Sequence, residues 1–315
     1  MPPVDRNNPK RAKSSESAYS LMEFMRSFPD DAACLEWLWR TRCSEDGEHA
    51  YCPKCGQTRV FARYATKQQR QSWSCTACGY HLHPTAGTIF HKSSTSLHLW
   101  FYAMYLMAST RCGISAKQLE RELGVTYKTA WRMFTLIRNQ VMYQGDEPLS
   151  GTVEMDETYV GGVRRNGKTG RPGEGDRTKT PVFGMVQREG RVVALTVPNV
   201  QRATLLPHVI KRVLPSATIY TDELYVYGTL SREGYEHDTI EHGAGVYVSG
   251  DVHTNTIEGF WSLVKRGISG THHNVSSKWL QGYLNEYAWR YNNRDEAGPA
   301  MFLRLILRAA STPAV

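Results

Sequence analysis

The chain has 315 residues, of which 41% are apolar, a composition ordinary for a soluble protein with two or three domains. Lys and Arg number 38 against 30 Asp and Glu, and this formal charge of +8 favours a polyanionic partner, chiefly nucleic acid. Residues 1–20 contain no apolar run, which argues against a secretory signal. The most apolar segment, residues 97–109, is far shorter than the ~20 residues of a membrane span, so we expect a buried helix in a cytoplasmic protein.

The first part of the chain predicts a short arm followed by a small domain. Residues 1–17 are polar and charged, and we expect a disordered basic arm. Residues 18–42 have apolar side chains at helical spacing, divided by the sequence FPDD into two helices, with Asp30 or Asp31 capping the second. Residues 50–90 are strand-like, and we place the first domain at residues 18–90.

Four of the seven cysteines form two Cys-x-x-Cys pairs, CPKCG and CTACG, separated by nineteen residues. Each pair places two thiolates on one turn, the following Gly lets the backbone turn around an ion, and two pairs complete a tetrahedral site. A redox motif would need only one pair, and free buried thiols would need no paired spacing. The pattern therefore predicts a zinc ribbon with a hairpin between the pairs, and four zinc ligands: Cys52, Cys55, Cys75 and Cys78.

The remaining cysteines and two nearby histidines have simpler explanations. Cys34, Cys43 and Cys112 lie outside the paired pattern, and we expect them in the core. His81 and His83 offer competing zinc ligands, but we expect them on the strand that leaves the second Cys pair.

Residues 91–148 are strongly helical and contain a pattern typical of helix-turn-helix proteins. Ser115 can cap one short helix, Gly124 permits a turn, and Thr126 can cap a second helix. An ordinary helical hairpin would share this pattern, but the basic charge favours DNA binding. Base and phosphate contacts are then expected from the start of the second helix: Tyr127, Lys128, Thr129 and Arg132.

Residues 149–310 switch to strands and then return to helix. The order is one strand, two further strands, a helix near 203–214, another strand, and a helix beginning near 255. This is the order of an RNase H-like core. The predicted fold class is therefore α/β: an RNase H-like catalytic domain with a mixed sheet, preceded by the zinc ribbon and the helix-turn-helix domain.

An aspartate interrupts the apolar pattern of two of these strands. A carboxylate within an apolar strand is costly to bury without a partner, yet Asp156 and Asp222 both occupy such positions. The RNase H-like order brings them onto adjacent strands, with a helix that carries Glu258 lying across them. Two such charges 4 Å apart repel by ~4 kcal/mol at an effective dielectric near 20. Divalent cations reverse that sign, so the three carboxylates predict a Mg²⁺ or Mn²⁺ site for phosphodiester chemistry. Individually, Asp156 or Glu157 could end a strand, and Asp222 could start a turn.

The helix near residue 255 carries a polar stripe at helical spacing: Asn255, Glu258, Ser262 and Lys265. One interpretation is ordinary, with Asn255 and Glu258 forming a capping box. In an RNase H-like core the stripe instead points at the two aspartates, and the opposite face is anchored by Ile257, Trp261 and Val264. Lys265 lies ~10.5 Å along the axis from Glu258, which suits a neighbouring DNA phosphate. Asn255 is then either the helix cap or an auxiliary neutral ligand.

Residues 164–180 form a predicted loop rich in Gly, with six Lys or Arg against two acidic residues. The loop follows the Asp156 strand, so it could grip target or flanking DNA through Arg164, Arg165 and Lys168. A solvated loop is the alternative.

Several motifs together carry a resemblance to a known family. Asp156, Asp222 and Glu258, with 35 residues between the last two, resemble the aspartate–aspartate–glutamate transposases and integrases. Over residues 20–300, the chain resembles the ISXO-like insertion-sequence transposases through CPKCG…CTACG, MDETYVGG, TDE, HTNTIEGFWSLVKRG and YLNEYAWRYNNR. In that group the third position is Asn or Glu followed by Lys, and this chain offers both residues, Asn255 and Glu258, before Lys265. The resemblance implies DNA cleavage at element ends, strand transfer into target DNA, and a dimer or larger assembly on two DNA ends.

We therefore expect a nucleoid-associated DNA transposase with structural Zn²⁺ and catalytic Mg²⁺ or Mn²⁺. One alternative is a transcription regulator that uses only residues 20–145 and carries an inactive nuclease-like domain. The other is a structure-selective nuclease without a joining step. Metal-dependent nicking distinguishes the enzyme from the regulator, and strand transfer from precut ends distinguishes the transposase from the nuclease.

Overall fold

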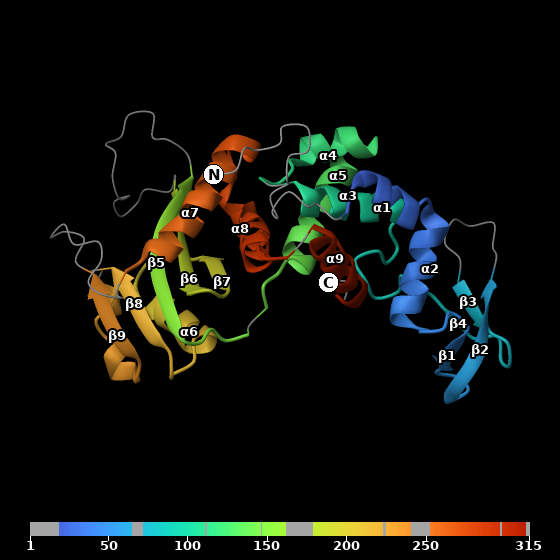
Figure 1. Cartoon of the computed structure of the whole chain (residues 1–315), viewed down its shortest axis with the longest axis horizontal. Coiled ribbons are helices and arrows are strands. Elements are labelled where there is room, and N and C mark those ends of the chain that lie inside the picture. Colours follow the sequence, from blue (N-terminus) through green and yellow to red (C-terminus); the bar gives the residue numbers. More distant parts are fainter. Residues whose placement is uncertain are drawn as a thin grey trace, which may run out of the picture. The chain divides into compact units, whose positions relative to one another are not determined.

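The computed structural model divides the chain into two compact units, Met1–Val141 with Asp295–Val315, and Met142–Arg294 (Figure 1). The structure describes residues 19–64, 72–110, 112–145, 147–161, 179–222, 225–240, 253–296 and 298–312. Within these ranges, no helix combines the length and the apolar character needed to cross a membrane.

The first unit is built around one apolar helix, α3 (Leu97–Ser109), which the sequence predicted as a buried helix. Before it come α1 (Leu21–Ser27) and α2 (Asp31–Arg42). Asp30 caps α2 by accepting a hydrogen bond from the Ala33 amide at 2.8 Å. The predicted helix pair and its cap are therefore confirmed.

The last helix, α9 (Gly298–Ser311), belongs to the first unit. It contacts α3 and α2. Phe302 of α9 is buried, and its ring centroid lies 5.6 Å from Phe24 and 5.9 Å from Tyr105. The sequence instead predicts a catalytic domain that extends to residue 310. The difference arises because an aromatic cluster from three separate helices buries α9, a long-range packing that local periodicity does not encode.

A small antiparallel sheet follows α2, with strands in the order β1 (His49–Cys52), β2 (Gln57–Tyr64), β3 (Ser72–Cys75) and β4 (His81–Leu82). Trp73 of β3 stacks on Trp39 of α2 with ring centroids 4.6 Å apart and planes 5° apart, and both rings are buried. This aromatic stack fixes the sheet against the helix, because two large apolar rings leave water together.

Two short helices, α4 (Ala116–Leu123) and α5 (Tyr127–Leu136), form the predicted pair, and α5 continues into the π-helical turn η2 (Ile137–Val141). Ser115 accepts a hydrogen bond from the Gln118 amide at 3.1 Å. Thr126 caps α5 through the Thr129 amide, and Gly124 between the helices is left-handed with φ 61°. The predicted caps and the predicted turn are confirmed.

The described residues of the second unit form a five-stranded mixed sheet in the order β7-β6-β5-β8-β9 (Figure 1). Its strands are β5 (Thr152–Gly161), β6 (Lys179–Gln187), β7 (Val192–Thr196), β8 (Thr218–Asp222) and β9 (Glu236–Ile240). β5, β6 and β7 pair antiparallel, whereas β8 pairs parallel with both β5 and β9. The structure confirms the predicted α/β class, the mixed sheet and the strand order, and it adds β9, which the sequence analysis did not predict.

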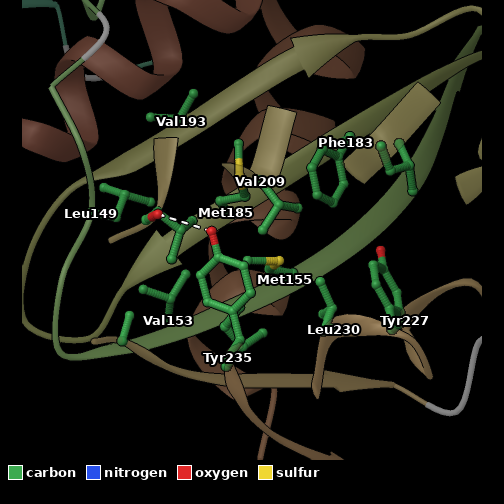
Figure 2. Close-up of a cluster of buried hydrophobic side chains, with 14 of the residues drawn as sticks. Leu149, Val153, Met155, Phe183, Met185, Val193, Val209, Tyr227, Leu230 and Tyr235 are labelled. Carbon is green, nitrogen blue, oxygen red and sulfur yellow. Dashed lines mark hydrogen bonds between the residues drawn. The ribbon is translucent and has the colours of Figure 1, made fainter. Parts of the chain in front are cut away.

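One face of this sheet holds the core of the second unit. Met155 and Phe183 on the strands pack with Val209 of α6 (Arg202–Arg212), as Figure 2 shows. Tyr235 closes the cluster and donates its hydroxyl to the Val213 carbonyl at 3.2 Å (Figure 2). Short 3₁₀ turns η3 (Tyr225–Tyr227) and η4 (Leu230–Glu233) contribute Tyr227 and Leu230 to the same cluster.

The opposite face of the sheet is covered by the last helices of the second unit. α7 (Asn255–Gly267) contacts β5 and β6, and α8 (Ser277–Asn292) contacts β7. A π-helical turn, η6 (Ile268–His272), connects them. Since side chains alternate along β5, the residues that face α7 are the even-numbered ones, among them Glu154 and Asp156.

Candidate active site

Three carboxylates meet where β5 and β8 run side by side. The parallel register pairs Met155 with Thr221, so the next residues, Asp156 and Asp222, are neighbours on the same face. One carboxylate oxygen from each of Asp156, Glu157 and Asp222 lies within 4.8 Å of the others. The structure thus brings together the two predicted aspartates, and it adds Glu157, which the sequence analysis had not singled out.

Asp156 is the carboxylate most affected by this crowding. Burial, followed by the negative charges of Glu157 and Asp222, raises the pKa of Asp156 to about 7. The indole Nε1 of Trp261 donates a hydrogen bond to Asp156 Oδ2 at 3.0 Å. This donor fixes the direction of the side chain but brings no positive charge to Asp156. Three carboxylates this close together have the electrostatics of a cation site.

Glu157 is held from the other side of the strand by Tyr227. The Tyr227 hydroxyl donates to Glu157 Oε2 at 3.0 Å, and the tyrosine ring is buried in the core shown in Figure 2. Burial and the charge of Glu157 raise the pKa of Tyr227 well above its ordinary value. Tyr227 therefore stays protonated and acts as a fixed donor that orients Glu157.

Glu154, two residues before Asp156, holds the start of α7. Its side chain is fully buried, and its Oε2 accepts hydrogen bonds from the Thr256 and Ile257 amides at 2.8 and 3.0 Å. Its Oε1 accepts from the Thr256 hydroxyl at 2.8 Å and from Arg188 Nε at 2.7 Å. A carboxylate at this position satisfies unpaired first-turn amides and complements the helix dipole.

The capping role considered for Asn255 is therefore wrong. Asn255 is the first residue of α7 and is exposed, the N-cap position is Thr254, and no side-chain hydrogen bond from Thr254 caps the helix. The acceptor comes instead from β5, through Glu154. A local sequence pattern cannot reveal such a cap, because the donor and the acceptor are about a hundred residues apart in the chain.

α7 runs along β5 in the same direction as the strand (Figure 1). Its first turn contacts Glu154, and Trp261, one turn further on, contacts Asp156. Gly184 on β6, the register partner of Asp156, makes this approach possible. A Cβ at Gly184 would lie 2.4 Å from the Trp261 ring, so any other residue would push the indole away from Asp156.

The predicted orientation of α7 needs a correction. Ile257, Trp261 and Val264 are buried, and they face the sheet rather than the side opposite the carboxylates. The helix lies flat on the strands, so its apolar face is the one that meets them. The four stripe residues are all exposed: Asn255, Glu258, Ser262 and Lys265.

Glu258 does not belong to the group formed by Asp156, Glu157 and Asp222 among the described residues. Its Oε1 accepts a hydrogen bond from the Thr254 hydroxyl at 3.1 Å. The structure therefore brings Asp156 and Asp222 together but leaves Glu258 outside their immediate contact, and the roles of Asn255, Glu258 and Lys265 stay predictions.

The four paired cysteines form a second group in the first unit. All four Sγ atoms lie within 4.8 Å of one another, with Cys52–Cys78 at 3.6 Å and Cys55–Cys75 at 4.0 Å. Four sulfurs at ~2.3 Å from a tetrahedral zinc ion would be ~3.8 Å apart, so the arrangement fits that ion. The glycines that follow the two pairs, Gly56 and Gly79, have φ of 69° and 70°, the left-handed turn expected from the sequence.

The environment of Cys75 favours the thiolate. Burial raises its pKa, but hydrogen bonds from the backbone of Ala77 and Cys78 outweigh this effect and lower the pKa to about 7. His81 lies on β4, as expected, and shares a hydrogen bond of 2.9 Å with the Ser72 hydroxyl. His81 is therefore engaged away from the cysteines.

The unpaired cysteines differ from one another in exposure. Cys34 is buried, as predicted, and Cys43 is partly buried. Cys112 is exposed, so its expected place in the core is wrong. It follows α3 in the connection to α4, where the chain has left the apolar pattern of the helix.

The candidate DNA-contacting residues of α5 lie at its start. Tyr127, Lys128 and Arg132 are exposed, whereas Thr129 is partly buried and its hydroxyl lies 3.1 Å from the Thr126 hydroxyl. The basic-loop residues fall outside the described part of the chain: Arg164, Arg165 and Lys168.

Three residues of the site were not predicted from the sequence: Glu154, Glu157 and Tyr227. A signal was present for Glu154, since in TVEMDET it occupies the same strand face as Asp156 and is flanked by apolar residues. No comparable signal existed for Tyr227, whose contact with Glu157 joins residues 70 positions apart.

Replacing Glu154 with Ala should destabilise the second unit by ~3–5 kcal/mol, because two helix amides and the partly buried Arg188 would lose this acceptor. Amide hydrogen exchange in the full chain measures this loss, as faster exchange throughout α7 and β5.

The exposed pair Arg202–Glu233, at 2.9 Å, provides a matched control in the same unit. Glu233→Ala should cost less than ~1 kcal/mol, because water and side-chain motion already weaken such pairs. Equal effects of the two substitutions would contradict the anchoring role of Glu154.

Two solved structures resemble the chain weakly. The pre-cleavage Mos1 transpososome and the Mos1 strand transfer complex each cover 68% of this chain at 15% identity, with TM-scores of 0.25 and 0.26. These matches cover 79% and 78% of the respective Mos1 chains. Because these TM-scores are so low, the family assignment rests on sequence comparison alone.

Sequence comparison gives the classification. A family model described as the ISXO2-like transposase domain matches residues 148–292. An uncharacterized protein of the transposable element ISH50 in Halobacterium salinarum is 32% identical over 258 residues, which span 76% of this chain and 84% of that protein. An uncharacterized transposase-like protein of Haemophilus influenzae is 29% identical over 120 residues, or 38% of this chain and 96% of that protein. This chain therefore belongs to the ISXO2-like transposases.

Proposed function

We propose that the chain cuts DNA at the ends of an insertion sequence and joins the cut ends to target DNA. The observation that carries the proposal is the meeting of Asp156 and Asp222 on adjacent parallel strands, in a chain of a transposase family. The family relationship and this pair of carboxylates together favour a transposase over the transcription regulator and over the nuclease without a joining step.

The carboxylates suit a divalent cation. Hard oxygen donors within 4.8 Å of one another are typical ligands of Mg²⁺ or Mn²⁺. A cation would offset both the burial and the repulsion that raise the pKa of Asp156. When bound, such ions supply an activated water or 3′-hydroxyl and stabilise the leaving oxygen of a phosphodiester.

The chain's own residues have distinct roles in this proposal. Asp156 and Asp222 hold the cation, and Trp261 orients the Asp156 carboxylate through its hydrogen bond of 3.0 Å. Glu258 is the proposed third carboxylate, with Asn255 as an auxiliary neutral ligand and Lys265 on a nearby DNA phosphate. Glu157 competes with Glu258 for the third position, because it already lies beside the two aspartates.

Substitutions that keep the side-chain shape test the proposal. Asp156→Asn and Glu258→Gln should each slow Mg²⁺-dependent cleavage of terminal DNA by roughly 10³-fold, since several kcal/mol of transition-state stabilisation would be lost. DNA binding measured in Ca²⁺ should be unchanged. Glu157→Gln is the matched comparison and should retain more activity than Glu258→Gln.

If Glu157→Gln lost more cleavage activity than Glu258→Gln, the third ligand would be Glu157 instead of Glu258. An active Asp156→Asn variant would refute the enzyme and favour the transcription regulator. Cleavage without strand transfer from precut ends would favour the nuclease.

Metal binding should depend on pH. A cation binds the ionised carboxylate, and a group with a pKa of about 7 is mostly protonated at pH 6 and mostly ionised at pH 8. Calorimetric titration of the full chain with Mn²⁺ should therefore give an affinity ~10-fold higher at pH 8 than at pH 6. In Asp156→Asn this pH dependence should disappear together with most of the affinity. Binding of equal strength at both pH values in the unsubstituted chain would contradict the assignment.

Zinc binding by the four cysteines is proposed as structural. Cys75→Ser should abolish zinc binding and weaken binding to terminal DNA, while the second unit stays folded, because the ribbon depends on all four thiolates. Elemental analysis gives the zinc content. Cys112→Ser is the control, since Cys112 is exposed and lies outside the group. Full zinc content in Cys75→Ser would refute the ligand assignment.

The proposed DNA contacts come from both units. The exposed start of α5, with Tyr127, Lys128 and Arg132, is proposed to read terminal DNA together with the ribbon. Thr129 is partly buried and contributes more to the cap of the helix than to DNA. The basic segment 164–180 is proposed to hold target or flanking DNA. A dimer or larger assembly would bring two DNA ends together.

A further inference from the structure

A cavity of about 350 Å³ lies in the second unit beside Lys265. It is bounded by the end of β5, the last turn of α7, η6 and the residues up to Val275. Its volume lies within the ~300–1,000 Å³ of small-ligand sites.

The walls of this cavity have two chemical characters. Val160, Ile268 and Val275 are each 8% exposed and give it an apolar side. Lys265 and Asn274 are exposed residues that give it a polar side, with one positive charge and one amide. An apolar slot beside a cation and an amide suits a flat heterocycle that carries a phosphate.

The backbone around the cavity departs from regular structure at two points. α7 changes into the π-helical turn η6, and His273 directly after it has φ 58° and ψ −47°, which is unusual for a residue other than Gly. His273 Nδ1 donates to the Ser269 carbonyl at 3.0 Å and so holds the turn in this shape. π-helical turns and such backbone outliers concentrate at functional sites.

The cavity is close to the carboxylates. Tyr159 follows Asp156 by three residues on β5, or ~10 Å, and Lys265 follows Trp261 by four residues on α7, or ~6 Å. DNA rises ~3.4 Å per nucleotide along its axis, so the ~6–10 Å between the carboxylates and the cavity corresponds to about two or three nucleotides along a strand.

We propose that the cavity takes one extrahelical nucleotide of the terminal DNA, within about three positions of the cut. The base enters between Val160, Ile268 and Val275, Asn274 bonds to its edge, and Lys265 holds its phosphate. The inference rests on the proposed function, because it requires terminal DNA at the carboxylates. Removing a base from the stack costs free energy, and a pocket that receives it restores the lost contacts.

The test uses the full chain in Ca²⁺ with terminal-repeat duplexes that carry one 2-aminopurine within three positions of the cut. When the 2-aminopurine occupies the position of the extrahelical nucleotide, protein binding should raise its fluorescence several-fold, as expected for an unstacked base. A duplex mismatched at that position should also bind several-fold more tightly than the matched duplex, because less pairing is lost. This second measurement holds even if a side chain quenches the fluorophore.

Two neighbouring substitutions provide a matched pair. Ser269 is exposed and lines the cavity, so Ser269→Phe should fill it and abolish both effects. Gly270 is exposed and is not a lining residue, and a Cβ there meets nothing within 4 Å, so Gly270→Phe should preserve both effects. Lys265→Ala should weaken binding of matched and mismatched duplexes alike.

Failure of this inference differs from failure of the proposed function. A duplex that is cleaved in Mg²⁺ but shows neither effect at any position would overturn the nucleotide site and leave the transposase intact. Effects that survive Ser269→Phe would also overturn it, since the base would then lie elsewhere. A duplex that is bound but never cleaved would refute the proposed function.

Discussion

The second unit depends on one buried carboxylate, that of Glu154, where β5 meets the first turn of α7. It accepts hydrogen bonds from two helix amides, one hydroxyl and the guanidinium of Arg188. Arg188 also donates to the His253 carbonyl and lies 4.9 Å from the centroid of the Tyr220 ring. Because a buried charge is tolerated only with such partners, these contacts fix where α7 begins along the strand.

Once its start is fixed, the position of α7 along β5 decides what lies over each strand residue. Trp261 falls over Asp156, and Gly184 on the neighbouring strand leaves the space that the indole needs. Further along, the last turn of α7 and η6 meet the end of β5 around the cavity. The candidate metal centre and the candidate nucleotide site are therefore positioned by the same pair of elements.

Features encoded within a few residues were predictable from the sequence. The caps Ser115 and Thr126, the left-handed Gly124 and the paired cysteines all depend on neighbouring positions, and the structure has them as predicted. The order of β5 to β8 followed from the pattern of apolar residues, and the meeting of Asp156 with Asp222 followed from the resemblance of this order to an RNase H-like core. Packing across the chain was not predictable. Three features depend on contacts between segments far apart in the chain: the cap from Glu154, the packing of α9 in the first unit, and the side of α7 that faces the sheet. Such contacts leave no periodic pattern in the sequence.

Glu154 and Asp156 lie on the same face of β5 but have different hydrogen-bond partners and different neighbouring charges. Both face α7, two residues apart. Glu154 has a guanidinium and three further donors, so the protein itself compensates its charge. Asp156 receives a neutral indole donor, and its burial together with two neighbouring carboxylates raises its pKa to about 7. A fold selected only for stability gains nothing from this second arrangement, because the repulsion costs free energy. A cation that recovers this cost would make the same three groups favourable, so the contrast between the two neighbours favours Asp156 over Glu154 for the proposed metal centre.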